Sequence, residues 1–375
     1  MISSKPLLSI PFLFKTESNL ASENIFSNGY FFSLGRDALL VGLSKLGLKA
    51  GDCIIVPAYI CYSTIKPLED YGYIIKYVDI NEKMELSIDH LEESIIKNDA
   101  KLILAAHYFG FLVDLTNVLA ISKKYGLLVI EDCAHNFLSG RKYQNNKILG
   151  DAAIFSLRKT LPVNGGGVLC IKNDETYSRN NKSNIKKYSR TDLLFISKFL
   201  IFKLIIKIGF PNIYSSTFTY FKNKTRSSFG LFKLNHNSSH FFNLPYEYRS
   251  KIFNKYTSNL KYLEKVIYKN RSNFKILSTE LLKNNFLLYK ERLIEEEVPQ
   301  VLVVKDLNAK LSVLHLRKIG VPAYLWPGKE LPNEVLLSKN FPVTNEYNQL
   351  MVLLPVHIDL TASDIKKICS SYKSI

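Results

Sequence analysis

The sequence lacks the features that mark secreted, fibrous and metal-binding proteins. Its cysteines are odd in number and without the close spacing of metal sites or small disulfide-rich domains: Cys53, Cys61, Cys133, Cys170 and Cys369. The first residues, MISSKPLLSIPFLF, carry little charge and are interrupted by Pro6 and Pro11, so they form a poor signal peptide. No collagen, heptad or solenoid repeat is visible. We therefore expect a globular protein of the reducing cytoplasm.

Acidic residues are scarce mainly in one region. The chain has 50 basic and 33 acidic residues, a net charge of +17. Between residues 176 and 233, twelve Lys or Arg accompany one acid, Asp192, and this stretch alone contributes +11. Because no known nucleic-acid-binding motif accompanies the charge, we expect no nucleic-acid partner.

The composition and the order of elements indicate an α/β protein. With 375 residues and 47% hydrophobic residues, the chain is long enough for a large and a smaller domain. Short apolar runs predict strands at residues 53–56, 73–78, 102–106, 127–131, 153–156 and 167–171. Amphipathic runs predict helices at 37–46, 60–70, 88–97 and 115–125, three of which end near a glycine. This alternation indicates a mainly parallel sheet with helices on both faces.

The regularity ends after residue 171. We predict a large domain over residues 1–250 with a basic, apolar insertion at about 176–233, and a small α+β domain over 251–375. Its clearest elements are a helical pattern around 246–268, strands at 301–304 and 351–354, and a final helix from Thr361.

Two ionisable residues follow successive predicted strands. Asp132 comes after strand 127–131, and Lys159 lies in a loop before the glycine run 165–167. Each alone has an ordinary interpretation, as a turn aspartate or a solvated lysine. Together they match pyridoxal phosphate (PLP), which needs an amine for its aldehyde and an acid that keeps its ring nitrogen protonated. Ligands in such sheets bind at the carboxyl ends of the strands, where both residues lie.

A phosphate site is predicted where residues 35–38 open an amphipathic helix. Backbone N–H groups at Gly35, Arg36 and Asp37 could face an anion at the positive helix end, and Ser156 could add a hydroxyl. Asp37 could instead cap this helix.

Several motifs together resemble the DegT/StrS family of PLP-dependent sugar aminotransferases, of which the chain looks like a divergent member. The family reads like G-T-S-A-L, D-E-V-I-V-P-A-Y, V-H-x-Y-G, V-I-E-D-A-A-Q, F-S-x-x-x-x-K, G-x-G-G and L-P-x-H-x-x-L-T. The corresponding segments here are GRDAL (35–39), DCIIVPAY (52–59), AHYFG (106–110), VIEDCAH (129–135), FSLRK (155–159), GGG (165–167) and LLPVHIDLT (353–361).

The resemblance implies PLP-dependent transferase fold type I and a homodimer with its active sites at the subunit interface. It implies transfer of an amino group, usually from L-glutamate, to a keto-sugar nucleotide. Lys159 would hold the cofactor and then move a proton, Asp132 would bind the ring nitrogen, and His135 would support them. A buried histidine with a purely structural role is the alternative for His135.

Three departures from the family pattern affect the cofactor site. The segment before Lys159 is two residues shorter, and the phosphate motif G-T-S is replaced by Gly35-Arg36-Asp37. Because an aspartate repels phosphate, backbone amides or Arg36 must do more of the binding. The aromatic residue that stacks on the cofactor ring maps onto Cys61, so Tyr59 or Tyr62 would have to substitute. The residues expected to contact substrates are His107, Tyr59, Tyr324 and Trp326.

The apolar run 193–210 contains Lys198, Lys203 and Lys207, which argue against a membrane span. We expect an insertion that packs on the dimer or covers the active site. A more specific hypothesis is that this segment makes a peripheral contact with the anionic inner membrane leaflet.

The leading interpretation is a PLP-dependent aminotransferase of nucleotide-linked keto-sugars in bacterial surface-polysaccharide synthesis. A PLP- or PMP-dependent sugar dehydratase is one alternative, although such relatives replace the lysine with histidine. A non-catalytic regulatory protein on the same fold is the other.

Overall fold

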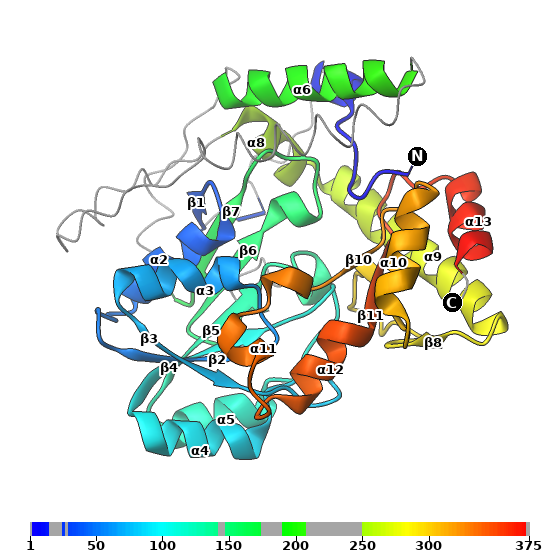
Figure 1. The fold of residues 1–375 in the computed structure, drawn as a ribbon. Coiled ribbons are helices and arrows are strands. Elements are labelled where there is room, and N and C mark those ends of the chain that lie inside the picture. Colours follow the sequence, from blue (N-terminus) through cyan, green and yellow to red (C-terminus); the bar gives the residue numbers. More distant parts are fainter. Residues whose placement is uncertain are drawn as a thin grey trace.

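Two β-sheets organise the protein, whose computed structural model describes residues 2–14, 25–26, 29–141, 147–173, 190–207 and 250–372. The central sheet has seven strands in the order β1-β7-β6-β5-β4-β2-β3 (Figure 1). Strands β6, β5, β4, β2 and β3 run parallel, β7 is antiparallel to β6, and β1 is antiparallel to β7. The bounds are β1 Tyr30–Phe32, β2 Cys53–Pro57, β3 Ile74–Val78, β4 Ala100–Ala106, β5 Leu128–Cys133, β6 Ala152–Ser156 and β7 Gly167–Ile171.

Helices cover both faces of the central sheet, as predicted (Figure 1). Alternate residues of a strand point to opposite faces, so Ile54 and Leu102 pack with one helical layer and Ile55 and Ile103 with the other. Because both faces are covered, these strands are apolar throughout rather than alternating. The first layer holds α2 Gly35–Lys45 and α3 Tyr62–Tyr71, and the second holds α4 Ile88–Asn98 and α5 Thr116–Tyr125.

The second sheet has four antiparallel strands in the order β10-β11-β9-β8. It forms a separate hydrophobic core with helices of the C-terminal part. The strands are β8 Leu287–Leu288, β9 Val301–Lys305, β10 Tyr324–Leu325 and β11 Met351–Pro355. The helices of this core are α9 Leu260–Lys283, α10 Ala309–Lys318, α12 Pro342–Leu350 and α13 Ala362–Ser371. Two further helices, α8 Lys251–Thr257 and α11 Asn333–Leu336, pack in cores of the central sheet.

Helix α9 takes part in both cores. Leu263 and Val266 pack with residues under the central sheet, whereas Phe274, Leu277 and Leu281 pack in the core of the second sheet. The predicted domain division near residue 250 stays a prediction, because this helix contributes to the packing on both sides of it.

Only residues 190–207 of the predicted insertion lie within the described residues, and they form α6 Arg190–Lys207. Phe195, Ile196 and Phe199 pack against the core under the central sheet. The carboxylate of Asp192 accepts hydrogen bonds from the Ser250 hydroxyl and the Lys251 N–H, which ties the start of α6 to α8. No helix in the described ranges has the length and apolar character needed to cross a bilayer. The predicted membrane contact stays a hypothesis.

Candidate active site

A cavity of about 150 Å³ opens where the carboxyl ends of β4, β5 and β6 meet the start of α2. It brings together nine of the residues predicted from the sequence: Gly35, Arg36, Cys61, His107, Asp132, His135, Ser156, Lys159 and Trp326. The segments that supply them are up to about 290 positions apart in the chain, so only the fold brings them together.

Asp132 supplies the carboxylate of the cavity. It lies within β5, one residue before its end, and not just past the strand as predicted. Its side chain is buried, and one carboxylate oxygen accepts the N–H of Ala134 at 2.9 Å. Burial raises the pKa of this carboxyl, while the charge of Lys159 and the Ala134 hydrogen bond oppose that effect. A cation in the cavity would therefore stabilise the ionised form.

Lys159 supplies the amine. It ends a single 3₁₀ turn, Leu157–Lys159, that follows β6 directly. Burial lowers the pKa of its ammonium group; Asp132 opposes this effect, and the charge of Arg158 adds to it. A lowered pKa increases the fraction of neutral amine, the form that attacks an aldehyde.

The glycine run fixes this turn against the start of α2. A Cβ atom at Gly167 would lie well inside 3.0 Å of the Leu34 carbonyl oxygen, so only glycine lets β7 approach that peptide. Gly166, with φ of +100°, donates its N–H to the Ser33 carbonyl and accepts the N–H of Leu157. The run therefore sets the distance between the lysine turn and the helix start rather than lining the cavity itself.

The start of α2 and Ser156 lie side by side in the cavity wall. A Cβ atom at Gly35 would lie 3.3 Å from the Ser156 Cβ atom, so glycine leaves room beside the serine hydroxyl. Contrary to the prediction, Asp37 does not line the cavity. One of its carboxylate oxygens accepts the N–H of Leu34 at 3.1 Å, which stabilises the first turn of its own helix. Its repulsion of a phosphate is thereby reduced.

Three predicted aromatic residues lie elsewhere. Tyr59 is fully buried, and its hydroxyl donates to the Trp326 carbonyl. Tyr62 is exposed on α3, where its hydroxyl donates to Glu69. Neither lines the cavity, so neither replaces the ring-stacking aromatic that Cys61 displaces. Tyr324 lines a second cavity, described below.

His135 and Trp326 form an aromatic wall of the cavity. The His135 ring stacks on Phe109 with centroids 5.6 Å apart, and the indole of Trp326 meets it edge-on at 4.8 Å. Burial lowers the pKa of His135 well below its usual value, and the charges of Lys159 and Lys5 add to this effect, so the ring is neutral. Burial raises the pKa of the Cys61 thiol to about 11, so this group also stays neutral.

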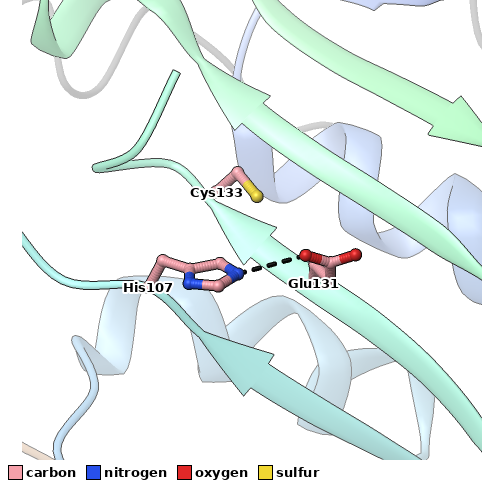
Figure 2. Close-up of side chains that lie close together, drawn as sticks. All are labelled: His107, Glu131 and Cys133. Atoms are coloured by element: carbon pink, nitrogen blue, oxygen red, sulfur yellow. Dashed lines mark hydrogen bonds and ion pairs between the residues drawn. The ribbon is translucent and has the colours of Figure 1, made fainter. Parts of the chain in front are cut away.

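His107 lies beneath the cavity floor in a buried cluster with Glu131 and Cys133 (Figure 2). Its Nδ1 atom accepts the Val113 N–H at 3.1 Å, so Nε2 carries the proton and donates to Glu131 at 3.1 Å. Of the residues that the structure describes, this trio is the one group with metal-ligand spacing. Both histidine nitrogens already have protein partners, so the trio is better suited to support the sheet than to bind a metal.

Lys159 also borders a second cavity of about 260 Å³ on the side of the C-terminal sheet. Tyr324, Arg317 and Lys5 line it. Two buried acceptors of residues in its wall, Oδ1 of Asn270 and Nδ1 of His357, have no hydrogen-bond partner among the described residues. Lys159 therefore lies between two cavities. The first ends at the start of α2, and the second is lined by cationic groups and by residues with unused acceptors. This second cavity could not be predicted from the sequence, because its walls come from distant segments.

Comparison with known proteins gives a match to the DegT/DnrJ/EryC1/StrS aminotransferase family over residues 28–188. This part of the chain is therefore similar to the family. They include Asp132, Lys159 and most of the cavity wall, and the match confirms the resemblance predicted from the motifs.

Two curated relatives are similar over part of the chain. GDP-perosamine synthase of Escherichia coli O157:H7 is 32% identical over 167 residues, 43% of this chain and 45% of that protein. The pleiotropic regulatory protein of Geobacillus stearothermophilus is 31% identical over 166 residues, 43% of this chain and 44% of that protein. The similarity thus spans about half the length of these relatives.

A solved structure supports the fold over nearly the whole chain. NtdA from Bacillus subtilis, with bound cofactor PMP, has a TM-score of 0.61 at 19% identity and covers 92% of this chain and 72% of that one. This likeness confirms the predicted fold class, a mainly parallel sheet with helices on both faces and an α+β C-terminal part.

Proposed function

We propose that the protein is a PLP-dependent aminotransferase that moves an amino group from an amino acid, expected to be L-glutamate, to a nucleotide-linked keto-sugar. The main evidence for this proposal is that Lys159 and Asp132 line the same cavity. Both residues lie within the segment 28–188 that matches the family. PLP, when bound, acts as an electron sink for the carbon next to the transferred amine.

The side chains of the cavity match the two reactive ends of PLP. The Asp132 carboxylate suits a protonated ring nitrogen, because a nearby cation offsets the burial that raises its pKa. The Lys159 amine, with its lowered pKa, suits the aldehyde. Once free of the cofactor, that amine is placed to move a proton at the α-carbon of the amino-acid substrate.

The second cavity suits the substrates. Lys159 lines both cavities, so a molecule in the second would lie beside this residue. Arg317 and Lys5 there can attract carboxylate or phosphate groups. Tyr324 and Trp326 remain proposed substrate contacts, one in each cavity.

The biological setting is proposed from the names of similar proteins. Two similar proteins are GDP-perosamine synthase and the spore coat polysaccharide biosynthesis protein SpsC of Bacillus subtilis. Their names support a sugar acceptor and a role in surface-polysaccharide synthesis. A cytoplasmic location is proposed from the cysteine pattern of the sequence. We also propose a homodimer, as the family resemblance implies.

The test is the absorption spectrum of the purified protein with PLP, recorded before and after L-glutamate is added. We expect a visible band from lysine-bound cofactor that glutamate bleaches. Lys159→Ala should lack the band, whereas Lys123→Ala, an exposed lysine of α5, should keep it. No band in the wild-type protein, or a band that persists without Lys159, would refute the proposal.

A non-catalytic regulatory role is the second candidate. The observation that favours it is Cys61, which occupies the place of the ring-stacking aromatic and has no substitute in Tyr59 or Tyr62. This candidate predicts weak PLP binding and no response to glutamate. A sugar dehydratase is less favoured, because Lys159 is retained.

A further inference from the structure

Two arginines lie at the α2 end of the cofactor cavity. Arg36 is the second residue of α2, and Arg158 immediately precedes Lys159 in the 3₁₀ turn. Both line the same cavity as Asp132 and Lys159. Arg36 figured in the sequence prediction, whereas Arg158 did not, because an arginine in a loop reads as a solvated residue.

Neither guanidinium group is held in an ion pair with a described residue. Among residues 2–14, 25–26, 29–141, 147–173, 190–207 and 250–372, no side chain forms an ion pair or a hydrogen bond with the guanidinium group of Arg36 or Arg158. The charge of Asp37 acts on both arginines, but one of its carboxylate oxygens accepts the Leu34 N–H. Burial and the charge of Arg36 lower the pKa of Arg158 and the charge of Asp37 raises it, so the two cations lie close enough to repel each other. An anion between them would remove that repulsion.

Further donors lie at the same end of the cavity. The backbone N–H groups of Gly35 and Arg36 belong to the first turn of an 11-residue helix and have no acceptor among the described residues. Gly35 leaves space beside the Ser156 hydroxyl. Two amides, one hydroxyl and two guanidinium groups therefore surround one end of the cavity, and all of them can donate to phosphate oxygens.

We propose that Arg158, together with Arg36, binds the phosphate group of PLP and takes over the work of the hydroxyl side chains missing from the start of α2. In a 3₁₀ turn successive side chains diverge by about 120°. Arg158 and Lys159 can therefore hold opposite ends of one small molecule, the phosphate and the aldehyde. This inference rests on the proposed function and adds the residue that anchors the cofactor.

The experiment compares PLP with pyridoxal, which lacks the phosphate. Trp326 is the sole tryptophan of the chain and lines the cavity, so its fluorescence reports binding without any need for catalysis. Dissociation constants are measured for the wild-type protein, Arg158→Gln, Arg158→Lys and Arg36→Gln. Arg292→Gln, an exposed arginine outside the cavity, is the matched control.

We expect Arg158→Gln to weaken PLP binding about 10- to 100-fold, the usual effect of losing a charge-assisted contact. Pyridoxal binding should change by less than about 2-fold, which would also demonstrate that the variant is folded. Arg158→Lys should restore part of the affinity, because lysine keeps the charge but not the two-pronged geometry. Inorganic phosphate should compete with PLP in the wild-type protein and less in Arg158→Gln.

Two results would overturn the inference while leaving the proposed function intact. One is unchanged PLP affinity in Arg158→Gln, and the other is an equal loss for PLP and pyridoxal, which would indicate a general structural role. A wild-type protein that binds neither compound would instead refute the proposed function, and the inference with it.

Discussion

Replacement of Glu131 by glutamine tests how the floor of the active site is supported. The Glu131 side chain is fully buried and accepts three hydrogen bonds from described residues: from Nε2 of His107 at 3.1 Å and from the N–H groups of Leu149 and Gly150. The donors lie on both carboxylate oxygens, and glutamine keeps only one oxygen. Whichever way its amide is turned, an NH₂ group faces a donor. His107 cannot move its proton from Nε2 to Nδ1 to accept from this NH₂ group, because its Nδ1 atom already accepts the N–H of Val113.

The expected loss of stability follows from these contacts. Removal of one partner from a buried charged contact costs about 3–5 kcal/mol. Glutamine keeps the volume of the side chain and either one or two of the three contacts, so we expect the lower end, about 3 kcal/mol. The loss should be shared with His107. The double variant with His107→Gln should be less destabilised than the sum of the two single variants by more than about 1 kcal/mol.

Equilibrium unfolding in urea measures this loss. Trp326 fluorescence and far-ultraviolet circular dichroism report on different parts of the molecule, and coincident transitions would justify the use of free energies. Glu92→Gln is the control. The Glu92 carboxylate likewise accepts hydrogen bonds, from Lys124 and Tyr125, but it lies at the surface. It should change stability little. A Glu131→Gln protein within about 1 kcal/mol of wild type, with an unchanged urea dependence, would refute the reasoning.

Three further predictions concern other parts of the molecule. Gly167→Ala should lower the free energy of unfolding by about 1–3 kcal/mol and weaken PLP binding, because the added methyl group collides with the Leu34 carbonyl. Urea unfolding measures the first effect, and Trp326 fluorescence measures the second. His135 has a pKa below its unfolded value near 6.5, so the stability it contributes is present above about pH 6.5 and is lost as the pH falls below it. The apo protein should therefore lose up to about 1.4 kcal/mol more per pH unit below 6.5 than His135→Asn, measured by urea unfolding from pH 7 to 5; parallel curves would contradict this. Asp192→Asn should speed hydrogen exchange in α6 and leave the central sheet unchanged; equal protection in both proteins would mean that the link to Ser250 does not hold α6.

The parallel strands could be predicted because helices cover both of their faces, which makes each strand a continuous apolar run. Strands β1, β8 and β10 were missed because two or three residues are too few to display a period. The end of β5 was placed too early, at Glu131, because a charged residue such as Asp132 is expected at the surface from sequence alone. Inside the protein, Glu131 contacts His107 and the charge of Lys159 acts on Asp132; these two residues follow β4 and β6.

The site was predictable to the extent that residues after parallel strands gather at one edge of a sheet. That rule brings Asp132, Ser156 and Lys159 together. It says nothing of side-chain direction, which is why Asp37 and Tyr59 were placed in the cavity although they point away from it. The second cavity depends on how the C-terminal sheet packs against the lysine turn, and local sequence does not encode that packing.

Helix α9 limits how this protein can be recombined with its relatives. Its 24 residues extend about 36 Å as one rod, with Leu263 and Val266 in one core and Phe274, Leu277 and Leu281 in the other. A chimera joined just before α9 would set a foreign helix face against the core beneath the central sheet, and one joined after it would do the same to the C-terminal sheet. Under the proposed function, substrate range would therefore be exchanged between relatives more readily through loops that line the second cavity than through whole domains.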